Sequence, residues 1–181
     1  KVVHGLSCRR YEECSELVPG VFGLSAGAVS QRFIRASARK FRELQERRLE
    51  GYDLVAVLLD GKVFGTDEVV IALGITLTGE KVILGFVQTG SENAAVCGNF
   101  LNELIERGLQ YKDGLLFVID GSKGFYKAIQ KVFNGQAVVQ RCQWHKRENV
   151  VSYLPKHEQA TYRRRLQRAY EQSNYESAKA A

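Results

Sequence analysis

Asp53-Leu54-Val55-Ala56-Val57-Leu58-Leu59-Asp60-Gly61 and Leu115-Leu116-Phe117-Val118-Ile119-Asp120-Gly121 share one pattern, in which a continuous apolar run ends in Asp-Gly. Apolar runs of this length are typical of strands that are buried on both faces of a sheet. We therefore predict a strand in each segment, with each strand ending at its Asp-Gly pair.

The sequence between and after these two segments predicts an α/β chain. We expect further strands over 69–75, 82–87 and 137–140, and helices over 91–107, 122–134, 144–154 and around 162–170. Thr78-Gly79 is the expected hairpin turn, and Ser91 and Ser122 are the expected helix N-caps. The predicted order is three strands, helix, strand, helix, strand, helix.

This order constrains the topology of the sheet. Three consecutive strands with short turns form an antiparallel meander, whereas a fourth strand that follows a helix can cross over and pair in parallel with the first. Asp60 and Asp120 would then lie side by side, although sixty positions separate them in the sequence.

Asp60 and Asp120 are the candidate catalytic and metal-binding residues. Taken singly, Asp-Gly after a strand is ordinary turn chemistry, and that alternative stays open for each site. Two adjacent carboxylates repel each other unless a cation lies between them, and their oxygens suit Mg²⁺ or Mn²⁺. Two such ions can support an in-line phosphodiester displacement.

The charge distribution fits a polyanionic partner. The net charge of +6 divides into +4 over residues 1–50, −6 over 51–120 and +8 over 121–181. Basic segments favour phosphate contacts, while carboxylates between them suit metal ions. Solvated helix faces are the alternative explanation.

The first 50 residues are predicted to be helical, and one part of them is a candidate DNA-binding element. Gly23-Leu24-Ser25 precedes a helix of small residues, with Ser25 as its expected N-cap, in the manner of the second helix of a helix-turn-helix. The candidate DNA-contacting residues there are Ser30, Gln31, Arg32 and Arg35. A packing helix is the alternative. A basic connecting helix is expected around Phe41 and Leu44.

A second polar cluster spans residues 140–149. Cys142 and His145 have the spacing of zinc ligands, but no partner pair completes a structural zinc site, and no carboxylate supports a Cys-His nucleophile. We expect Cys142 to pack at the end of the strand and His145 to face phosphate near the site. Arg141, Lys146 and Arg147 are expected to contact DNA phosphates.

Composition excludes several other classes of protein. The chain has 181 residues, with 45% apolar and 25% charged, which is typical of a globular domain and not of a disordered or coiled-coil chain. The four cysteines form no Cys-x-x-Cys pair, so reduced thiols are expected. No apolar run approaches the roughly 20 residues of a membrane span, and we expect a cytoplasmic protein. The absence of methionine indicates a fragment of a longer protein.

Several motifs in this order resemble the mutator-type transposases of bacterial insertion sequences. They are Gly5-Leu6-Ser7, Arg9-Arg10-Tyr11, Gly23-Leu24-Ser25, Val29-Ser30, Leu59-Asp60-Gly61, the helix from Glu92 to Leu109, Ile119-Asp120-Gly121 with Gly124 and Ala128, and Gln140-Arg141-Cys142 with His145 and Asn149. The resemblance implies a ribonuclease H-like fold and cleavage and joining of DNA. It also implies an Asp, Asp, Glu triad that binds divalent metal.

By position, Asp60 and Asp120 match the two aspartates of that triad. Cys142 and His145 match a Cys-x-x-His element of the family, which we expect to shape the site. The third acid lies further downstream in the family, so we expect it beyond residue 181. Many relatives have adjacent Arg and Asn where this chain has Arg147-Glu148-Asn149.

The expected organisation has three parts: a DNA-binding helical remnant over 1–50, an incomplete ribonuclease H-like core over 51–155, and the start of a helical insertion over 156–181. The expected partners are transposon ends and target DNA, with a homo-oligomer to bring two ends together, and no membrane. A hydrolytic ribonuclease H-like nuclease and an inactive DNA-binding relic remain the alternatives.

Overall fold

The structure is a computed structural model that describes residues 25–65, 67–90 and 93–181. Its contacts divide the chain into two units, Lys1–Arg47 and Arg48–Ala181. Each unit is described here by itself.

The described part of the first unit is one long helix, α2 (Ala26–Glu46). Ser25 is its N-cap as expected, since the Ser25 hydroxyl accepts a hydrogen bond from the Ala28 amide at 3.2 Å. The candidate DNA-contacting helix and the basic connecting helix are thus a single element, because no residue between them breaks the backbone hydrogen bonding. The rest of the helical prediction for residues 1–24 lies outside the described residues.

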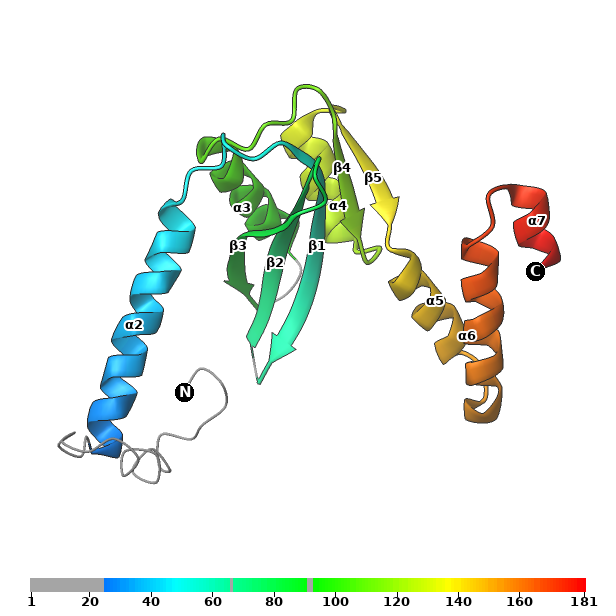
Figure 1. The fold of residues 1–181 in the computed structure, drawn as a ribbon, viewed down its shortest axis with the longest axis horizontal. Coiled ribbons are helices and arrows are strands. Elements are labelled where there is room, and N and C mark those ends of the chain that lie inside the picture. Colours follow the sequence, from blue (N-terminus) through cyan, green and yellow to red (C-terminus); the bar gives the residue numbers. More distant parts are fainter. Residues whose placement is uncertain (1–24, 66, 91–92) are drawn as a thin grey trace. The chain divides into compact units, whose positions relative to one another are not determined.

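The second unit contains a five-stranded mixed sheet with the order β3-β2-β1-β4-β5 (Figure 1). The strands are β1 (Leu54–Phe64), β2 (Asp67–Thr76), β3 (Lys81–Thr89), β4 (Leu115–Ile119) and β5 (Ala137–Arg141). β1 and β3 pair antiparallel with β2, whereas β4 pairs in parallel with β1 and β5. The predicted α/β class, meander and pairing of the fourth strand with the first are all present.

The helices of this unit are α3 (Ala94–Glu106), α4 (Lys123–Phe133), α5 (Gln143–Ser152), α6 (Lys156–Tyr170) and α7 (Tyr175–Ala180). Ser122 caps α4 as expected, since its hydroxyl accepts from the Phe125 amide. The prediction for α3 was wrong: the cap is Asn93, whose side chain accepts from the Ala95 amide, and Ser91 lies outside the described residues. The short helix α7 was not predicted.

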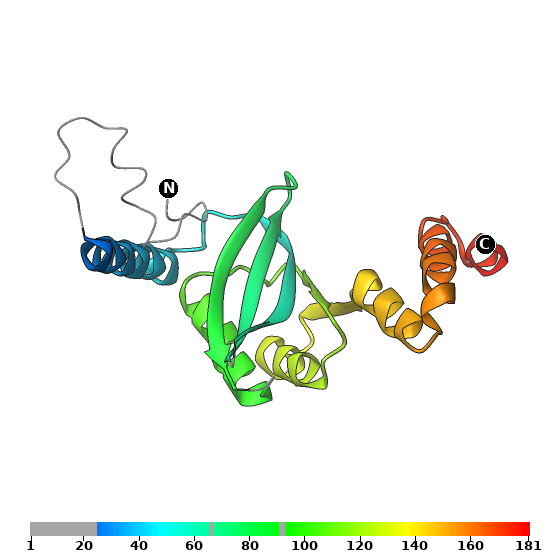
Figure 2. The ribbon, with the colours of Figure 1, turned by 90° about the horizontal axis from the view of Figure 1, so that it is seen from below.

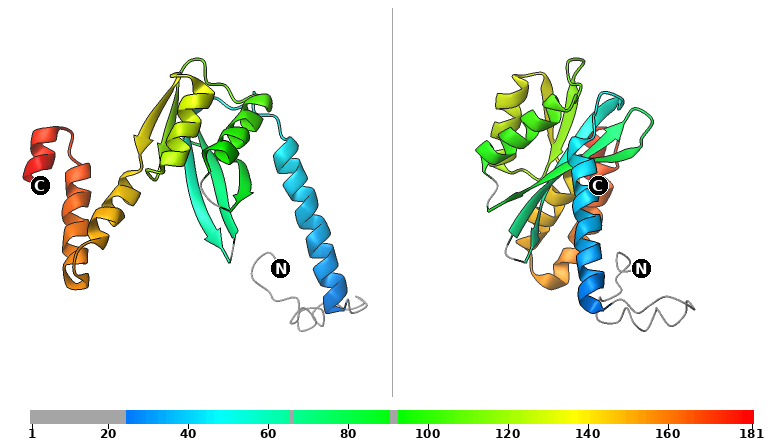
Figure 3. Two further views of the ribbon diagram at one scale, coloured as in Figure 1. Left: turned by 180° about the vertical axis from the view of Figure 1, so that it is seen from behind. Right: turned by 90° about the vertical axis from the view of Figure 1, so that its left-hand side faces the viewer.

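Helices α3 and α4 cover one face of the sheet (Figures 2 and 3). The core between them consists of fully buried side chains, among them Val57, Leu84, Leu101, Phe117, Phe125, Ile129 and Phe133. The opposite face is open in the described part of the chain, because Val55 is 43% exposed, Leu116 36% and Val138 67%. The prediction that the β1 and β4 strands are buried on both faces is therefore wrong.

The end of β1 also differs from the prediction. The strand continues through Asp60-Gly61 to Phe64, and Asp60 pairs with Ile71 of β2. The sequence pattern did not predict the last residues of β1 as strand, because Val63 and Phe64 are exposed, at 74% and 60%, and are not part of a buried apolar run. Asp60 thus lies inside a strand and not in a turn. No helix among the described residues is long and apolar enough to cross a membrane.

Candidate active site

Asp60 and Asp120 occupy equivalent positions on neighbouring parallel strands. Leu59 of β1 pairs with Ile119 of β4, and the two aspartates follow these residues directly. Leu59 and Ile119 are each 3% exposed and point into the core. Because successive side chains of a strand alternate between faces, the Asp60 carboxylate lies on the open face of the sheet. Asp120 is the first residue after β4.

The carboxylate of Asp60 has two basic neighbours. Lys62 Nζ lies 3.2 Å from Asp60 Oδ2, and His145 Nε2 lies 3.6 Å from Asp60 Oδ1. Lys62 is on the same face because it follows Asp60 by two residues in β1, whereas His145 reaches Asp60 from α5. The Asp60 side chain is 35% exposed, so an ion or a substrate can reach it.

Asp120 begins the loop between β4 and α4. Its Oδ1 accepts a hydrogen bond from the Ser122 amide at 2.8 Å, which is the turn chemistry that Asp-Gly pairs favour. Gly121 has φ 108°, a conformation that side chains other than glycine rarely adopt. The turn alternative therefore describes Asp120 in part and does not describe Asp60.

The Cys142-x-x-His145 pair lies where β5 passes into α5. The Cys142 amide donates to the Ile119 carbonyl at 2.7 Å, which ties the start of α5 to the end of β4. His145 is 28% exposed, and its Nδ1 is buried without a hydrogen-bond partner in the described structure. Trp144 contacts the imidazole edge-on, with ring centroids 4.8 Å apart. These contacts aim Nε2 of His145 at Asp60.

The oxygen ligands of this site suit a hard divalent cation only in part. Asp60 and Asp120 offer carboxylate oxygens, the donors that Mg²⁺ and Mn²⁺ prefer. Within the described ranges no group of three or more His, Cys, Asp and Glu side chains is arranged to hold a metal ion. The two aspartates thus fit one part of a metal-binding set, and the Asp60 carboxylate is paired with Lys62.

Arg141 lies next to this site, with Nε 3.3 Å from the Asp120 carbonyl oxygen. The guanidinium packs over Gly121, where an added Cβ would lie 2.6 Å from Arg141 Nε. Lys146 is exposed on α5.

Arg147 lies in an ion-pair network between α5 and α6. Its side chain is 16% exposed, and Nε lies 3.1 Å from Glu148 Oε1. Arg163 of α6 donates to the other Glu148 oxygen at 2.8 Å. The hydrogen bond from Arg163, with a smaller contribution from Arg147, lowers the pKa of Glu148 below its ordinary value of 4.5. Arg147 therefore has a partner within the chain.

The candidate DNA-contacting residues of α2 belong to the other unit. Gln31, Arg32 and Arg35 are exposed and Ser30 is half-buried. Arg35 Nε also donates to the Gln31 carbonyl at 3.3 Å, a contact within the helix.

Sequence reasoning missed Lys62. It would have been found from the period of two in β1 if the strand had been extended past Asp60.

The sequence was compared with known proteins. It matches the family described as Transposase, Mutator family over residues 2–181. The chain belongs to this family.

Three curated relatives of the mutator family illustrate the match. The transposase for insertion sequence element IS256 in transposon Tn4001 of Staphylococcus aureus is 37% identical over 51% of this chain and 23% of its own length. The transposase for IS6120 of Mycolicibacterium smegmatis is 30% identical over 85% of this chain and 49% of its own length. The transposase for IS905 of Lactococcus lactis is 29% identical over 92% of this chain and 44% of its own length. The chain thus spans at most about half the length of these relatives.

Proposed function

We propose that this chain is part of a transposase that cuts DNA at transposon ends and joins the freed strands to target DNA. The observation that supports the proposal most directly is the pairing of Leu59 with Ile119, which puts Asp60 and Asp120 at the same level of two parallel strands. Membership of the mutator family and the names of its relatives agree with it. We assign the sheet and helices of residues 51–155 to a ribonuclease H-like core of the DDE type.

In the proposed site, Asp60 and Asp120 hold Mg²⁺ or Mn²⁺. Such ions supply charge neutralisation at the scissile phosphate and activation of the attacking oxygen. His145 keeps the Asp60 carboxylate in place through its contact at 3.6 Å. Cys142 supports that arrangement by anchoring the first turn of α5 to β4.

We place the third acid of the triad downstream of residue 181 in the intact protein. None of Glu148, Glu158, Glu171 and Glu176 is assigned this role. Glu148 is already paired with Arg147 and Arg163. We further propose that residues 156–181 begin a helical insertion.

The proposed partners are double-stranded DNA at the transposon ends and at the target. Exposed Gln31, Arg32 and Arg35 on α2, with Ser30, and Lys146 on α5 are the proposed DNA contacts, together with Arg141. Arg147 is a weaker candidate because its guanidinium is engaged by Glu148. Joining two ends calls for a homo-oligomer, acting on nucleoid DNA in the cytoplasm.

The test is strand transfer by the intact transposase that contains this chain. Asp60→Asn and Asp120→Asn should each abolish strand transfer and leave DNA affinity within about twofold of wild type, because the amide keeps the shape but loses the charge that binds metal. Asp113→Asn, at an exposed position, is the matched control and should retain activity. Equal loss of binding and joining would reject the proposal in favour of a structural role.

The same experiment distinguishes transposition from simple hydrolysis. Cleaved ends that are never joined to target DNA would support the nuclease alternative. Full strand transfer by Asp60→Asn would exclude Asp60 from the chemistry.

A further inference from the structure

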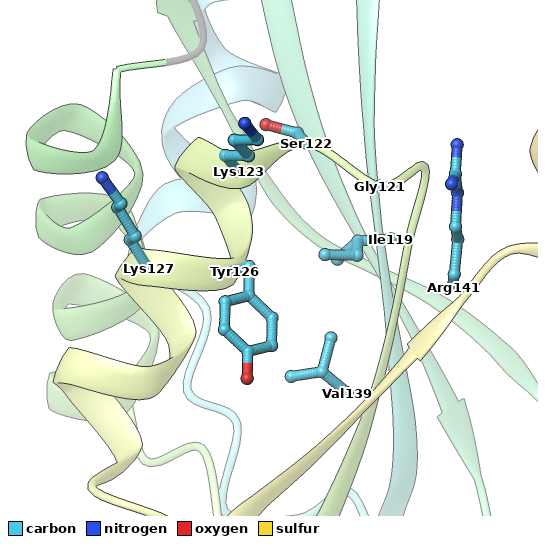
Figure 4. A pocket seen from close by; sticks show the side chains of 8 residues that line it. All are labelled: Ile119, Gly121, Ser122, Lys123, Tyr126, Lys127, Val139 and Arg141. Carbon is cyan, nitrogen blue, oxygen red and sulfur yellow. The ribbon is translucent and has the colours of Figure 1, made fainter.

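A cavity of about 340 Å³ lies between the first turns of α4 and strands β4 and β5 (Figure 4). Its volume is in the range of small-molecule sites, roughly 300–1,000 Å³. The candidate active site does not include it, because Ile119 and Val139 line it from the helix-bearing side of the sheet. Figure 4 shows Lys123 and Tyr126 on one side of it and Ile119, Val139 and Arg141 on the other.

The inner wall of the cavity is apolar and aromatic. The ring of Tyr126 lies close to Val139 in Figure 4, with Ile119 above them. Tyr126 is 50% exposed, so one part of its ring is available to a ligand. A flat aromatic group that enters the cavity would contact this ring, and aromatic rings stack well on one another.

The rim of the cavity is cationic. Lys123, Lys127 and Arg141 line it, and no carboxylate is among the described residues that do so. In Figure 4 the amine of Lys127 points outward, away from Tyr126, whereas Lys123 lies near the loop. A ligand with an anionic group beside its aromatic part matches this arrangement, and a nucleotide has both.

The cavity and the candidate active site share one loop. The Asp120 side chain accepts from the Ser122 amide, while the Asp120 carbonyl oxygen accepts from Arg141 Nε at 3.3 Å, and Ser122 and Arg141 both line the cavity. Gly121 permits this contact, because an added Cβ would lie 2.6 Å from Arg141 Nε. Residues 120–122 therefore connect the candidate active site with the lining of the cavity.

We propose that this cavity binds one unpaired nucleotide of the DNA substrate, with its base against Tyr126 and its phosphate between Lys123 and Arg141. The inference rests on the proposed function, because it names a position on the same DNA strand. A base within duplex DNA cannot occupy the cavity in this way, since it is stacked between its neighbours and its faces are not available to Tyr126. An unpaired base next to a cut end has its faces free.

The probe is a DNA duplex with a short single-stranded overhang that contains 2-aminopurine, compared with the blunt duplex of the same sequence. Binding to the 181-residue chain is measured by anisotropy at one fixed salt concentration. We expect the overhang to bind roughly tenfold more tightly, as base–aromatic stacking implies. We also expect quenching of 2-aminopurine by the Tyr126 ring.

Substitutions test separately what the Tyr126 ring and the basic side chains contribute to binding of the overhang. Tyr126→Ala should remove the preference for the overhang and the quenching, whereas Tyr126→Phe should retain both. Lys123→Gln should weaken overhang binding severalfold and reduce its dependence on salt. Lys131→Gln, on the same helix but outside the cavity, should change neither the overhang binding nor its dependence on salt. Circular dichroism checks the fold of each variant.

The outcomes distinguish this inference from the proposed function. Equal binding of overhang and blunt DNA, no DNA binding at all, or an unchanged preference in Tyr126→Ala overturns the nucleotide site, while strand transfer that depends on Asp60 would still support the transposase. Preference for the overhang that depends on Tyr126 supports the site even if Asp60→Asn joins DNA normally.

Discussion

Lys62 Nζ lies 3.2 Å from Asp60 Oδ2, two residues further along the same strand. The ammonium group takes the position next to the carboxylate that a divalent cation would need. Like charges repel, so Lys62 and the cation of the proposed site would compete for Asp60.

Removal of the Lys62 charge should therefore tighten metal binding. We expect Lys62→Met to lower the Kd for Mn²⁺ severalfold relative to wild type in isothermal titration of the 181-residue chain. Lys81→Met, at the exposed start of β3, is the matched control and should leave the Kd unchanged. An unchanged Kd in Lys62→Met would mean that Mn²⁺ does not bind at Asp60.

The glycine between the two proposed sites should be required for stability. Gly121→Ala forces a side chain into φ 108° and against Arg141, so we expect a loss of about 1–3 kcal/mol in the free energy of unfolding. Gly114→Ala shares the strained backbone, at φ 94°, but meets no atom within 4 Å. Urea denaturation should show a larger loss for Gly121→Ala; equal losses would contradict a role for the Arg141 contact.

The aromatic cluster under α4 should dominate the stability of the second unit. Phe133 is 1% exposed, and its ring centroid lies 4.8 Å from that of Phe117 and 5.1 Å from that of Tyr111. Phe133→Ala should cost about 3–5 kcal/mol in chemical denaturation, because it leaves a cavity in the core. Phe64→Ala, at a side chain 60% exposed, should cost far less. Similar losses would place Phe133 outside the cooperative core.

The pairing of α5 with α6 should weaken in acid. The pKa of Glu148 is lowered by the hydrogen bond from Arg163, so its charge stabilises the folded form fully above the ordinary pKa of 4.5. That contribution is lost as the pH falls through the lowered pKa. Helix content followed by circular dichroism should therefore decrease with acid in wild type more than in Glu148→Gln. Glu176→Gln, on α7, should behave like wild type. A wild-type acid profile in Glu148→Gln would mean that the Glu148 charge does not stabilise the pairing of α5 with α6.

The sequence predicted the meander and the pairing of β4 with β1 because each of these steps has a local cause. Three apolar runs with a Thr78-Gly79 turn require a meander, and Gly79 adopts φ 82° there. Ser122 and Asn134 delimit α4 at the expected positions, with Asn134 in the left-handed region at φ 44°. Parallel pairing of β1 with β4 then follows from the intervening helix α3.

Other features depend on tertiary contacts that sequence patterns do not express. The extension of β1 to Phe64 is maintained by its ladder with β2, not by an apolar run. The contact of His145 with Asp60 depends on where α5 begins, which the Cys142 amide determines through the Ile119 carbonyl. The cavity beside Tyr126 arises from how α4 packs against the edge of the sheet.

The two neighbours of β1 are unequal in length. Its ladder with β4 ends at the pair Leu59 and Ile119, while its ladder with β2 continues to Phe64. From Asp60 onward, β1 has no β4 partner on that side, and the Asp60 side chain is 35% exposed. For the proposed transposase, the unpaired edge of β1 beyond Leu59 would be the side from which a phosphate group reaches the Asp60 carboxylate.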